Sequence, residues 1–182
     1  FPISYIINDC VCEVWGYRKA RLLIWLGFGM NFFFVAMGAL CDTIPGAPYW
    51  HNEEGFHAVF GLAPRIALAS FVAFIVGSFM NAYVMSKMKI RDQGRHFSSR
   101  AVWSTVAGES CDSLIFFPLA LGGVVPLSAL PALMLWQVVL KTVYEIIALP
   151  VTIRVVKKLK KHEGEDVYDL GVSYNIWNVF SL

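Results

Sequence analysis

The chain has 182 residues, of which 57% are hydrophobic and only 15% are charged, and its formal net charge at pH 7 is +2. Soluble domains carry about 25% charged residues, so this composition excludes an ordinary soluble domain and indicates an integral membrane protein. A chain of this length has room for about five full or partial membrane spans of roughly 20 residues each and for no second domain. We therefore expect a single transmembrane domain over residues 1–182.

Five apolar segments follow one another along the chain and are predicted to be helices, because lipid offers no water to pair with exposed backbone groups. They cover residues 1–14, 22–40, 63–85, 101–121 and 129–155. The first is short, and the chain begins with Phe1 rather than Met, so we expect a further N-terminal helix that is missing here. The predicted fold class is an all-α, polytopic membrane helical bundle with five visible spans and six in total.

The basic residues predict the orientation of these spans. Thirteen of the fifteen fall into three clusters: Arg18, Lys19 and Arg21; Lys87, Lys89, Arg91, Arg95 and Arg100; and Arg154, Lys157, Lys158, Lys160 and Lys161. The stretches 41–62 and 122–128 between them carry no Lys or Arg. Because Lys and Arg accumulate in cytoplasmic loops, we expect the clusters to be solvated loops that face anionic lipid, with residues 157–182 as a cytoplasmic tail. The charge pattern thus indicates sidedness and gives no reason to expect nucleic-acid binding.

The first segment carries two acids, Asp9 and Glu13, four residues apart on one helical face. Glu13 lies near the first basic cluster, and one interpretation is a simple ion pair with Arg18 or Arg21. Asp9 lies deeper in the apolar segment and is harder to explain by such a pair.

The fourth segment contains the most informative pair, Glu109 and Asp112, in the middle of an apolar stretch long enough to span a bilayer. Ionisable groups at that depth are costly and are rarely there without a function. Three residues apart on a helix, the two carboxylates share a face and can point into one cavity. The pattern predicts a polar-ligand site inside the membrane.

Two basic residues, Arg65 and Lys141, lie outside the clusters, in or beside apolar segments. Lys141 is four residues before Glu145, so an intrahelical ion pair is the first interpretation. Arg65 follows Pro64 at the outer start of a span, where it can either extend to the interface or take a gating or substrate role. With five acids in or beside the spans against these two cations, the cavity is expected to suit a donor-rich or cationic ligand.

The remaining signals are weaker. Small residues at 69, 73 and 77 predict close helix packing, and Asn81 one turn further on fits either a packing hydrogen bond or a ligand contact. His51 and His57 match no metal-ligand spacing, and no glycine-rich phosphate loop is present, so we expect no metal, no cofactor and no ATP hydrolysis by the chain itself. No span contains a His beside a nucleophile, and we expect the protein not to be an enzyme.

Several separated motifs in order resemble the queuosine precursor transporters of bacteria, a family of six-helix, vitamin-uptake-like inner-membrane proteins. The motifs are Phe1-Pro-Ile-Ser-Tyr-Ile-Ile-Asn-Asp9, Glu13-Val-Trp-Gly-Tyr-Arg-Lys-Ala-Arg21, Pro64-Arg65-Ile-Ala-Leu-Ala-Ser70, Gly94-Arg95, Gly108-Glu109 with Asp112, and Lys141-Thr-Val-Tyr-Glu145. The resemblance covers nearly the whole chain. It departs from the family in lacking the first helix and in carrying Cys10 and Cys12.

The resemblance implies import of a 7-deazaguanine base, namely the cyano or aminomethyl precursor or queuine, into the cytoplasm for transfer RNA modification. Glu109 or Asp112 would accept the guanine-like donor edge, and the other acid of this pair would accept from the pyrrole N–H or attract the ammonium of the aminomethyl compound. Asp9 is a further expected substrate-binding residue. The expected further ligand contacts are stacking by Trp103, Tyr144 or Trp15 and a carbonyl-edge contact from Asn81 or Gln137. The expected gating or ion-pair residues are Arg65, Lys141, Glu145 and Glu13.

Three classes of function stay open at this point. A stand-alone transporter in the bacterial inner membrane, with its C-terminus in the cytoplasm, is the first. A substrate-binding membrane subunit that depends on a separate ATPase module, as in fold-related vitamin carriers, is the alternative, and an intramembrane enzyme is the third. The expected partners are a small nucleobase and the lipid bilayer, and a homodimer stays open.

Overall fold

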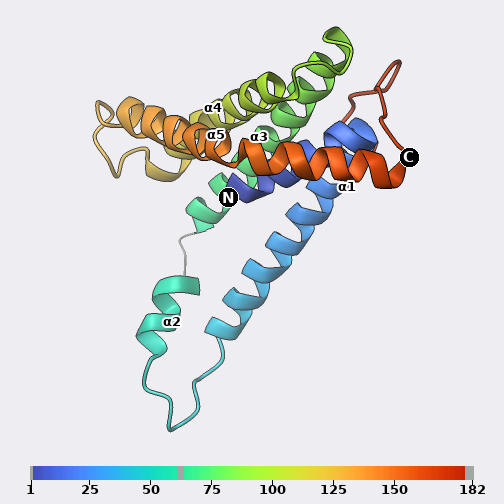
Figure 1. The fold of residues 1–182 in the computed structure, drawn as a ribbon. Helices are drawn as coiled ribbons and strands as arrows, with labels where there is room; N and C mark the ends of the chain where they lie inside the picture. The colour runs from blue at the N-terminus through green and yellow to red at the C-terminus, as the bar shows by residue number, and fades with distance from the viewer. Residues whose placement is uncertain (1, 61–63, 179–182) are drawn as a thin grey trace.

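The computed structural model describes residues 2–60 and 64–178, which form five helices (Figure 1). In chain order they are α1 (Pro2–Asp42), α2 (Glu53–Phe60), α3 (Pro64–Arg91), α4 (Phe97–Leu121) and α5 (Leu130–Glu163). Within these residues the β-structure is limited to one isolated bridge. The predicted all-α membrane fold is confirmed. Phe1, residues 61–63 and residues 179–182, at the edges of the predicted first span, third span and tail, lie outside the described residues.

Helix α1 contains both of the first two predicted spans, joined by a kink at Gly16. This glycine has φ 81° and ψ 178°, a left-handed conformation that costs little only for glycine. We call residues 2–15 the first half of α1 and residues 17–42 its second half. Figure 1 shows the two halves running in different directions from the kink. The predicted loop at the first basic cluster is therefore a bend inside one long helix.

Helices α3 and α4 pack against each other over the largest surface, and α5 packs against α4 and α1. Their backbones approach closely at Gly77 and Gly108: a Cβ atom added to Gly77 would lie 3.0 Å from the Gly108 carbonyl oxygen. On the same face of α3, Ala69 and Ala73 are buried. The prediction that the small residues of this segment serve close helix packing is confirmed.

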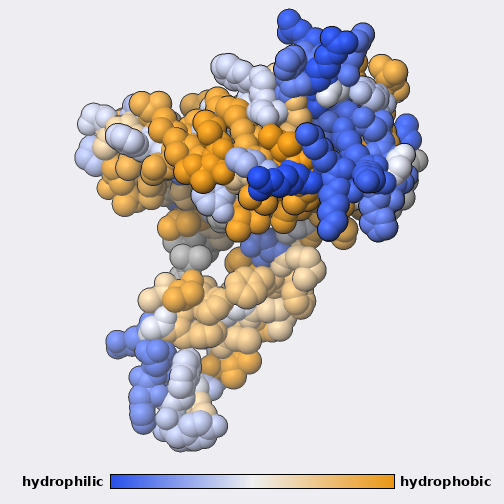
Figure 2. Space-filling view, in the orientation of Figure 1, coloured by the Kyte–Doolittle hydropathy of each residue, from blue (hydrophilic) through white to orange (hydrophobic). Residues whose placement is uncertain are grey.

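The second half of α1 and the short helix α2 extend away from the remaining helices (Figure 1). Figure 2 shows that this arm is largely apolar on its surface, apart from its polar end. Among the residues that the structure describes, three helices are long and apolar enough to span a membrane, over Ile3–Asp42, Arg65–Arg91 and Leu130–Glu163. The apolar exposed surface is what a membrane protein presents to lipid.

The basic clusters are not uniformly solvated. Arg21, Lys89 and Arg100 have exposed fractions of 1%, 2% and 0%. The prediction of solvated loops is wrong for these three residues. The physical reason is that each charge has acceptors inside the protein. The chain beyond α5 folds back and supplies acceptors to Arg21 and Lys89, whereas Arg100 donates to the Arg95 carbonyl and to the Glu13 carboxylate.

We call residues 164–178 the C-terminal segment. Its buried Asp169 accepts hydrogen bonds from the Tyr17 backbone N–H, at 3.0 Å, and from the Ser86 hydroxyl, at 2.5 Å. Arg21 donates to the carbonyls of Ser173 and Asn175 at 3.1 and 2.9 Å. Tyr17 is the first residue of the second half of α1, so Asp169 caps the N-terminal end of that half. The same contact fixes the C-terminal segment against the kink at Gly16.

Candidate functional site

A group of polar side chains lies inside the bundle, between the first half of α1 and helices α3, α4 and α5. We call it the polar cluster, and it consists of Tyr5, Asn8, Asp9, Asn81, Thr105, Glu109, Asp112, Gln137, Lys141 and Glu145. The members on α4 and α5 recur every three or four residues, so each helix presents them on one face. Most of the polar residues predicted from the sequence to bind a ligand are thereby brought together.

The acidic pair of α4 faces a cation from α5. Lys141 Nζ lies 2.5 Å from Glu109 Oε2 and 3.7 Å from Asp112 Oδ2. Gln137 donates to Asp112 Oδ2 at 3.2 Å. Lys141 was expected to pair with Glu145 along its own helix, but the acids it pairs with lie across the helix interface on α4. One ammonium group of α5 thus faces two carboxyl groups of α4.

Two further acids of the polar cluster are buried without a cation. Asp9 and Glu145 have exposed fractions of 0% and 1%. No ion pair involves either carboxylate in the part of the chain that the structure describes. The Ser104 hydroxyl is 3.4 and 3.5 Å from the two oxygens of Asp9, which makes only a long hydrogen bond. Burying a carboxylate without compensation is costly, which points to a role beyond stability.

Many polar atoms of the polar cluster are buried and have no hydrogen-bond partner among the described residues. They are Tyr5 Oη, Asn8 Oδ1, Asn81 Nδ2, Thr105 Oγ1, Glu109 Oε1 and Glu145 Oε1. Each such group costs about 1–3 kcal/mol while it stays unpaired, and native proteins contain few of them. Their concentration in one place is typical of a site that a ligand completes. Because the set includes both acceptors and donors, it suits a ligand that carries both.

A second polar group lies at the end of the bundle that holds the basic clusters, and its members are paired with one another. We call it the Glu13 network: Glu13 Oε2 accepts from Arg100 at 2.7 Å, and Glu13 Oε1 accepts from Lys160 at 2.7 Å. Lys89 donates to the Glu13 carbonyl and to Asp166 Oδ1 at 2.5 and 2.6 Å. The expected pairing of Glu13 with Arg18 or Arg21 is therefore wrong, because cations from α4 and α5 are closer.

Asp166 joins the C-terminal segment to this network. Partial burial alone would raise the pKa of its carboxyl group, but hydrogen bonds from Lys160 and Lys89 outweigh that effect and lower the pKa below its ordinary value. The carboxylate is therefore held in its charged form. This pairing stabilises the end of the bundle that holds the basic clusters, in contrast to the unpaired groups of the polar cluster.

The other predicted site residues lie elsewhere. Trp103 and Tyr144 have exposed fractions of 59% and 43% and lie on the outer surfaces of α4 and α5. Arg65 donates to the carbonyls of Leu119 and Gly122, both at 2.5 Å, and so caps the C-terminal end of α4. Within the described residues no group of three or more His, Cys, Asp and Glu side chains is placed to hold a metal ion.

Sequence reasoning missed Tyr5, Asn8 and Thr105. Tyr5 precedes Asp9 by four residues and Thr105 precedes Glu109 by four, so helical spacing from the acids is the signal that would have found these two. Asn8 is adjacent to Asp9 in the chain and is not found by that spacing. Asn81, which stayed open between packing and ligand contact, accepts a 3.1 Å hydrogen bond from Asn8 and keeps its own Nδ2 unpaired.

Comparison with known proteins identifies the family. A family model described as "Putative vitamin uptake transporter" matches residues 1–155. The chain belongs to this family. All members of the polar cluster lie within the residues that the family model matches, whereas Asp166 and Asp169 lie beyond them.

Two curated relatives of the chain are named for one substrate class. The "Probable queuosine precursor transporter" of Bacillus subtilis (strain 168) is 28% identical over 154 residues, which is 80% of this chain and 64% of that protein. The "Queuosine precursor transporter" of Escherichia coli (strain K12) is 30% identical over 125 residues, which is 66% of this chain and 52% of that protein. The chain thus spans less than two thirds of either relative. No solved structure matches it. The resemblance to queuosine precursor transporters found in the sequence is confirmed.

Proposed function

We propose that this vitamin uptake transporter imports a 7-deazaguanine base into the cytoplasm, where it serves transfer RNA modification. The substrate class is suggested by the names of its two curated relatives. The observation that carries the proposal is the fully buried Glu109, whose Oε1 is unpaired while its Oε2 is held by Lys141. A ligand with hydrogen-bond donors would supply the partner that Glu109 Oε1 lacks.

The guanine-like edge of the base offers an N–H and an adjacent NH₂ group, two parallel donors that one carboxylate accepts in bidentate fashion. In our proposal Lys141 moves off Glu109 Oε2 when the base binds, although a carboxylate oxygen can accept more than one hydrogen bond. Asp112 already lies 3.7 Å from the same ammonium and is the acid to which it would shift. Substrate recognition is then an exchange of donors at Glu109, in which Lys141 never loses its counter-ion.

The other unpaired groups supply the remaining contacts. Asn81 Nδ2 and the Thr105 hydroxyl are the donors that would meet the carbonyl edge of the base. Asp9 and Glu145 would attract the pyrrole N–H or the ammonium group of the aminomethyl compound. Trp103 and Tyr144 have no part in this arrangement, because both lie on the outer surface.

The Glu13 network is the element that would close the pathway on its cytoplasmic side. The basic clusters lie at this end, which the accumulation of Lys and Arg predicts to face the cytoplasm. Release of the base requires the contacts of Glu13 with Arg100 and Lys160 to open. In this scheme the network gates the pathway, while Arg65 anchors the opposite end of α4.

Restoration of queuosine in transfer RNA tests the proposal, in cells that can neither make nor import the base and that are supplied with each precursor. The full-length protein should restore the modification, and Glu109→Gln at equal membrane abundance should not. Glu54→Gln makes the same acid-to-amide change on exposed α2 and should behave as the parent. Failure of a well-expressed parent with every precursor base would contradict the proposal and favour a subunit that needs a separate ATPase.

A further inference from the structure

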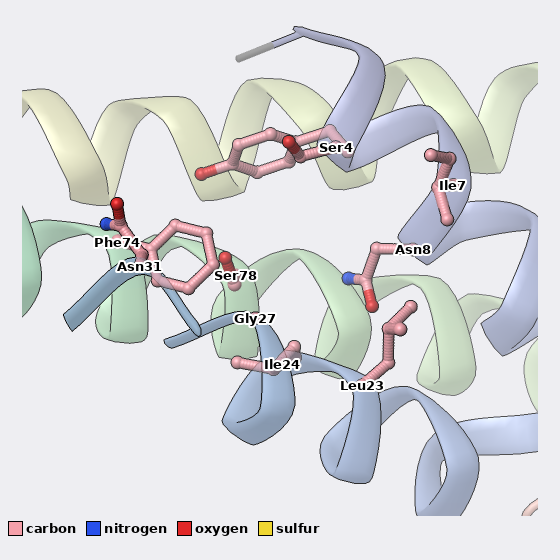
Figure 3. Close-up of a pocket in the computed structure, with 10 residues that line it drawn as sticks. Ser4, Ile7, Asn8, Leu23, Ile24, Gly27, Asn31, Phe74 and Ser78 are labelled. Atoms are coloured by element: carbon pink, nitrogen blue, oxygen red, sulfur yellow. The ribbon is translucent and has the colours of Figure 1, made fainter. Parts of the chain in front are cut away.

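A cavity of about 370 Å³ lies beside the polar cluster, between the two halves of α1 and α3. Small-molecule sites usually occupy roughly 300–1,000 Å³, so a single small ligand fits this space. Figure 3 shows Phe74 and Asn31 at one side of the cavity and Asn8 at the other. Leu23, Ile24 and Gly27 form the wall from the second half of α1 (Figure 3).

Two residues belong both to this cavity and to the polar cluster. Tyr5 and Asn8 line the cavity, are 3% and 5% exposed, and each carries a buried polar atom without a partner among the described residues. A Cβ atom placed on Gly77 would lie 2.7 Å from Tyr5 Oη and 3.0 Å from Asp112 Cβ. The Tyr5 side chain therefore lies between the cavity and the acidic pair, Glu109 and Asp112.

We propose that this cavity receives the planar ring of the base, with its donor edge directed past Tyr5 and Asn8 towards Glu109. This inference rests on the proposed function. It adds to the substrate site a second binding surface, which lies on the second half of α1. The walls combine apolar faces, such as Ile24 and Phe74, with polar groups, which is the lining expected for a heteroaromatic ring.

A lipid acyl chain fits the same walls less well. It would offer no partner to the amides of Asn8 and Asn31 or to the hydroxyl of Ser78, all of which line the cavity. A base with ring nitrogens and an exocyclic amine can bond such groups while its faces contact the apolar wall. The polar part of the lining therefore favours the base over lipid.

Gly27 and Gly29 on the second half of α1 provide a matched test. A Cβ atom on Gly27 would lie 3.8 Å from Phe74 Cζ, across the cavity, whereas a Cβ atom on Gly29 meets nothing within 4 Å. Gly27→Leu fills the cavity, and Gly29→Leu adds the same side chain to open space. The measurement is equilibrium binding of radiolabelled aminomethyl and cyano 7-deazaguanine to the purified full-length protein in detergent. We expect Gly27→Leu to bind about tenfold more weakly or worse, because a filled cavity has no room for the ring, and Gly29→Leu to bind as the parent does.

Each outcome separates this inference from the proposed function. One outcome is that the parent binds the base, Glu109→Gln does not, and Gly27→Leu binds like the parent. This result overturns the cavity inference and leaves the proposed function standing. A cavity filled by lipid would give it. Equal weakening by both leucine variants also overturns the inference. A parent that binds none of the bases contradicts the proposed function itself.

A second measurement covers a Gly27→Leu variant that does not fold. Asn31→Cys places a thiol in the cavity wall, in a Cys41→Ser background that removes the exposed native thiol. We expect saturating base to slow maleimide labelling of this thiol about fivefold or more, because a bound ring covers it. Unchanged labelling in a protein that binds the base would overturn the inference.

Discussion

Replacing Lys141 by methionine should destabilise the protein strongly, and the loss should depend on Glu109. The ammonium lies 2.5 Å from Glu109 Oε2 and 3.7 Å from Asp112 Oδ2, and Glu109 is fully buried. Removing one partner of a buried ion pair costs about 3–5 kcal/mol because the other charge is left uncompensated. The Lys141 side chain is 18% exposed, so water relieves part of that cost and we take about 3 kcal/mol.

The dependence is measured with a double-mutant cycle. In the Glu109→Gln background the fully buried carboxylate is gone and only Asp112, whose side chain is 17% exposed and 3.7 Å from the ammonium, loses its cation. Lys141→Met should then cost only about 1 kcal/mol, and the difference of about 2 kcal/mol is the interaction energy with Glu109. For a chain of this size about 3 kcal/mol corresponds to a fall in Tm of roughly 6–12 °C, which thermal unfolding in detergent resolves.

Base binding by the same variants separates stability from recognition. Glu109→Gln with Lys141→Met should be more stable than Lys141→Met alone yet still fail to bind the base, because the accepting carboxylate is absent. An equal loss of stability from Lys141→Met in both backgrounds would refute the ion pair. Base binding by the double variant would refute Glu109 as the acceptor.

Three further predictions concern the ends of the bundle. Gly16→Ala should lower stability by about 2–4 kcal/mol in a chemical or thermal unfolding assay, because alanine is strained at φ 81° and its Cβ would lie 2.7 Å from Asp169 Oδ1; an unchanged Tm would contradict the capped kink. Arg65→Gln should destabilise by about 1 kcal/mol and leave base affinity unchanged, since the side chain caps α4; a selective loss of affinity would assign Arg65 to substrate. The lowered pKa of Asp166 predicts stability that is fully present above about pH 4 to 5, the range of a free carboxyl group, and that is lost as the pH falls through the lowered value. When Tm is measured against pH, the Tm of the Asp166→Asn variant should fall less than that of the parent at acid pH. A parent Tm that does not change between about pH 5 and 3 would contradict the pairing with Lys160.

The sequence predicted the elements well because apolar length is a local property. The segment at 101–121 corresponds to α4 within a few residues, and the segment at 129–155 corresponds to α5, which continues to Glu163. The kink at Gly16 was missed because a polar stretch between two apolar runs has the same composition as a loop. The structure shows the bend in the φ of 81° at Gly16, and Val167 and Asp169 pack beside this residue.

The candidate site was predictable where depth in the membrane carried the signal. Glu109, Asp112 and Asp9 were singled out because acids are costly in apolar segments, and the structure brings them into one polar cluster. The partners of Lys141 and Glu13 were not predictable, since helical spacing suggests neighbours on the same helix while the closer acids and cations come from other helices. The outward positions of Trp103 and Tyr144 were missed for a related reason: in an all-apolar helix, hydrophobicity does not say which face is buried.

Uptake into lipid vesicles that contain the full-length protein as their only protein tests the central claim most directly. The parent should admit radiolabelled 7-deazaguanine base faster than protein-free vesicles, and Glu109→Gln should admit it no faster than they do, with Glu54→Gln matching the parent. Parent vesicles indistinguishable from protein-free vesicles for every precursor base would contradict transport by this chain through a carboxylate-lined site.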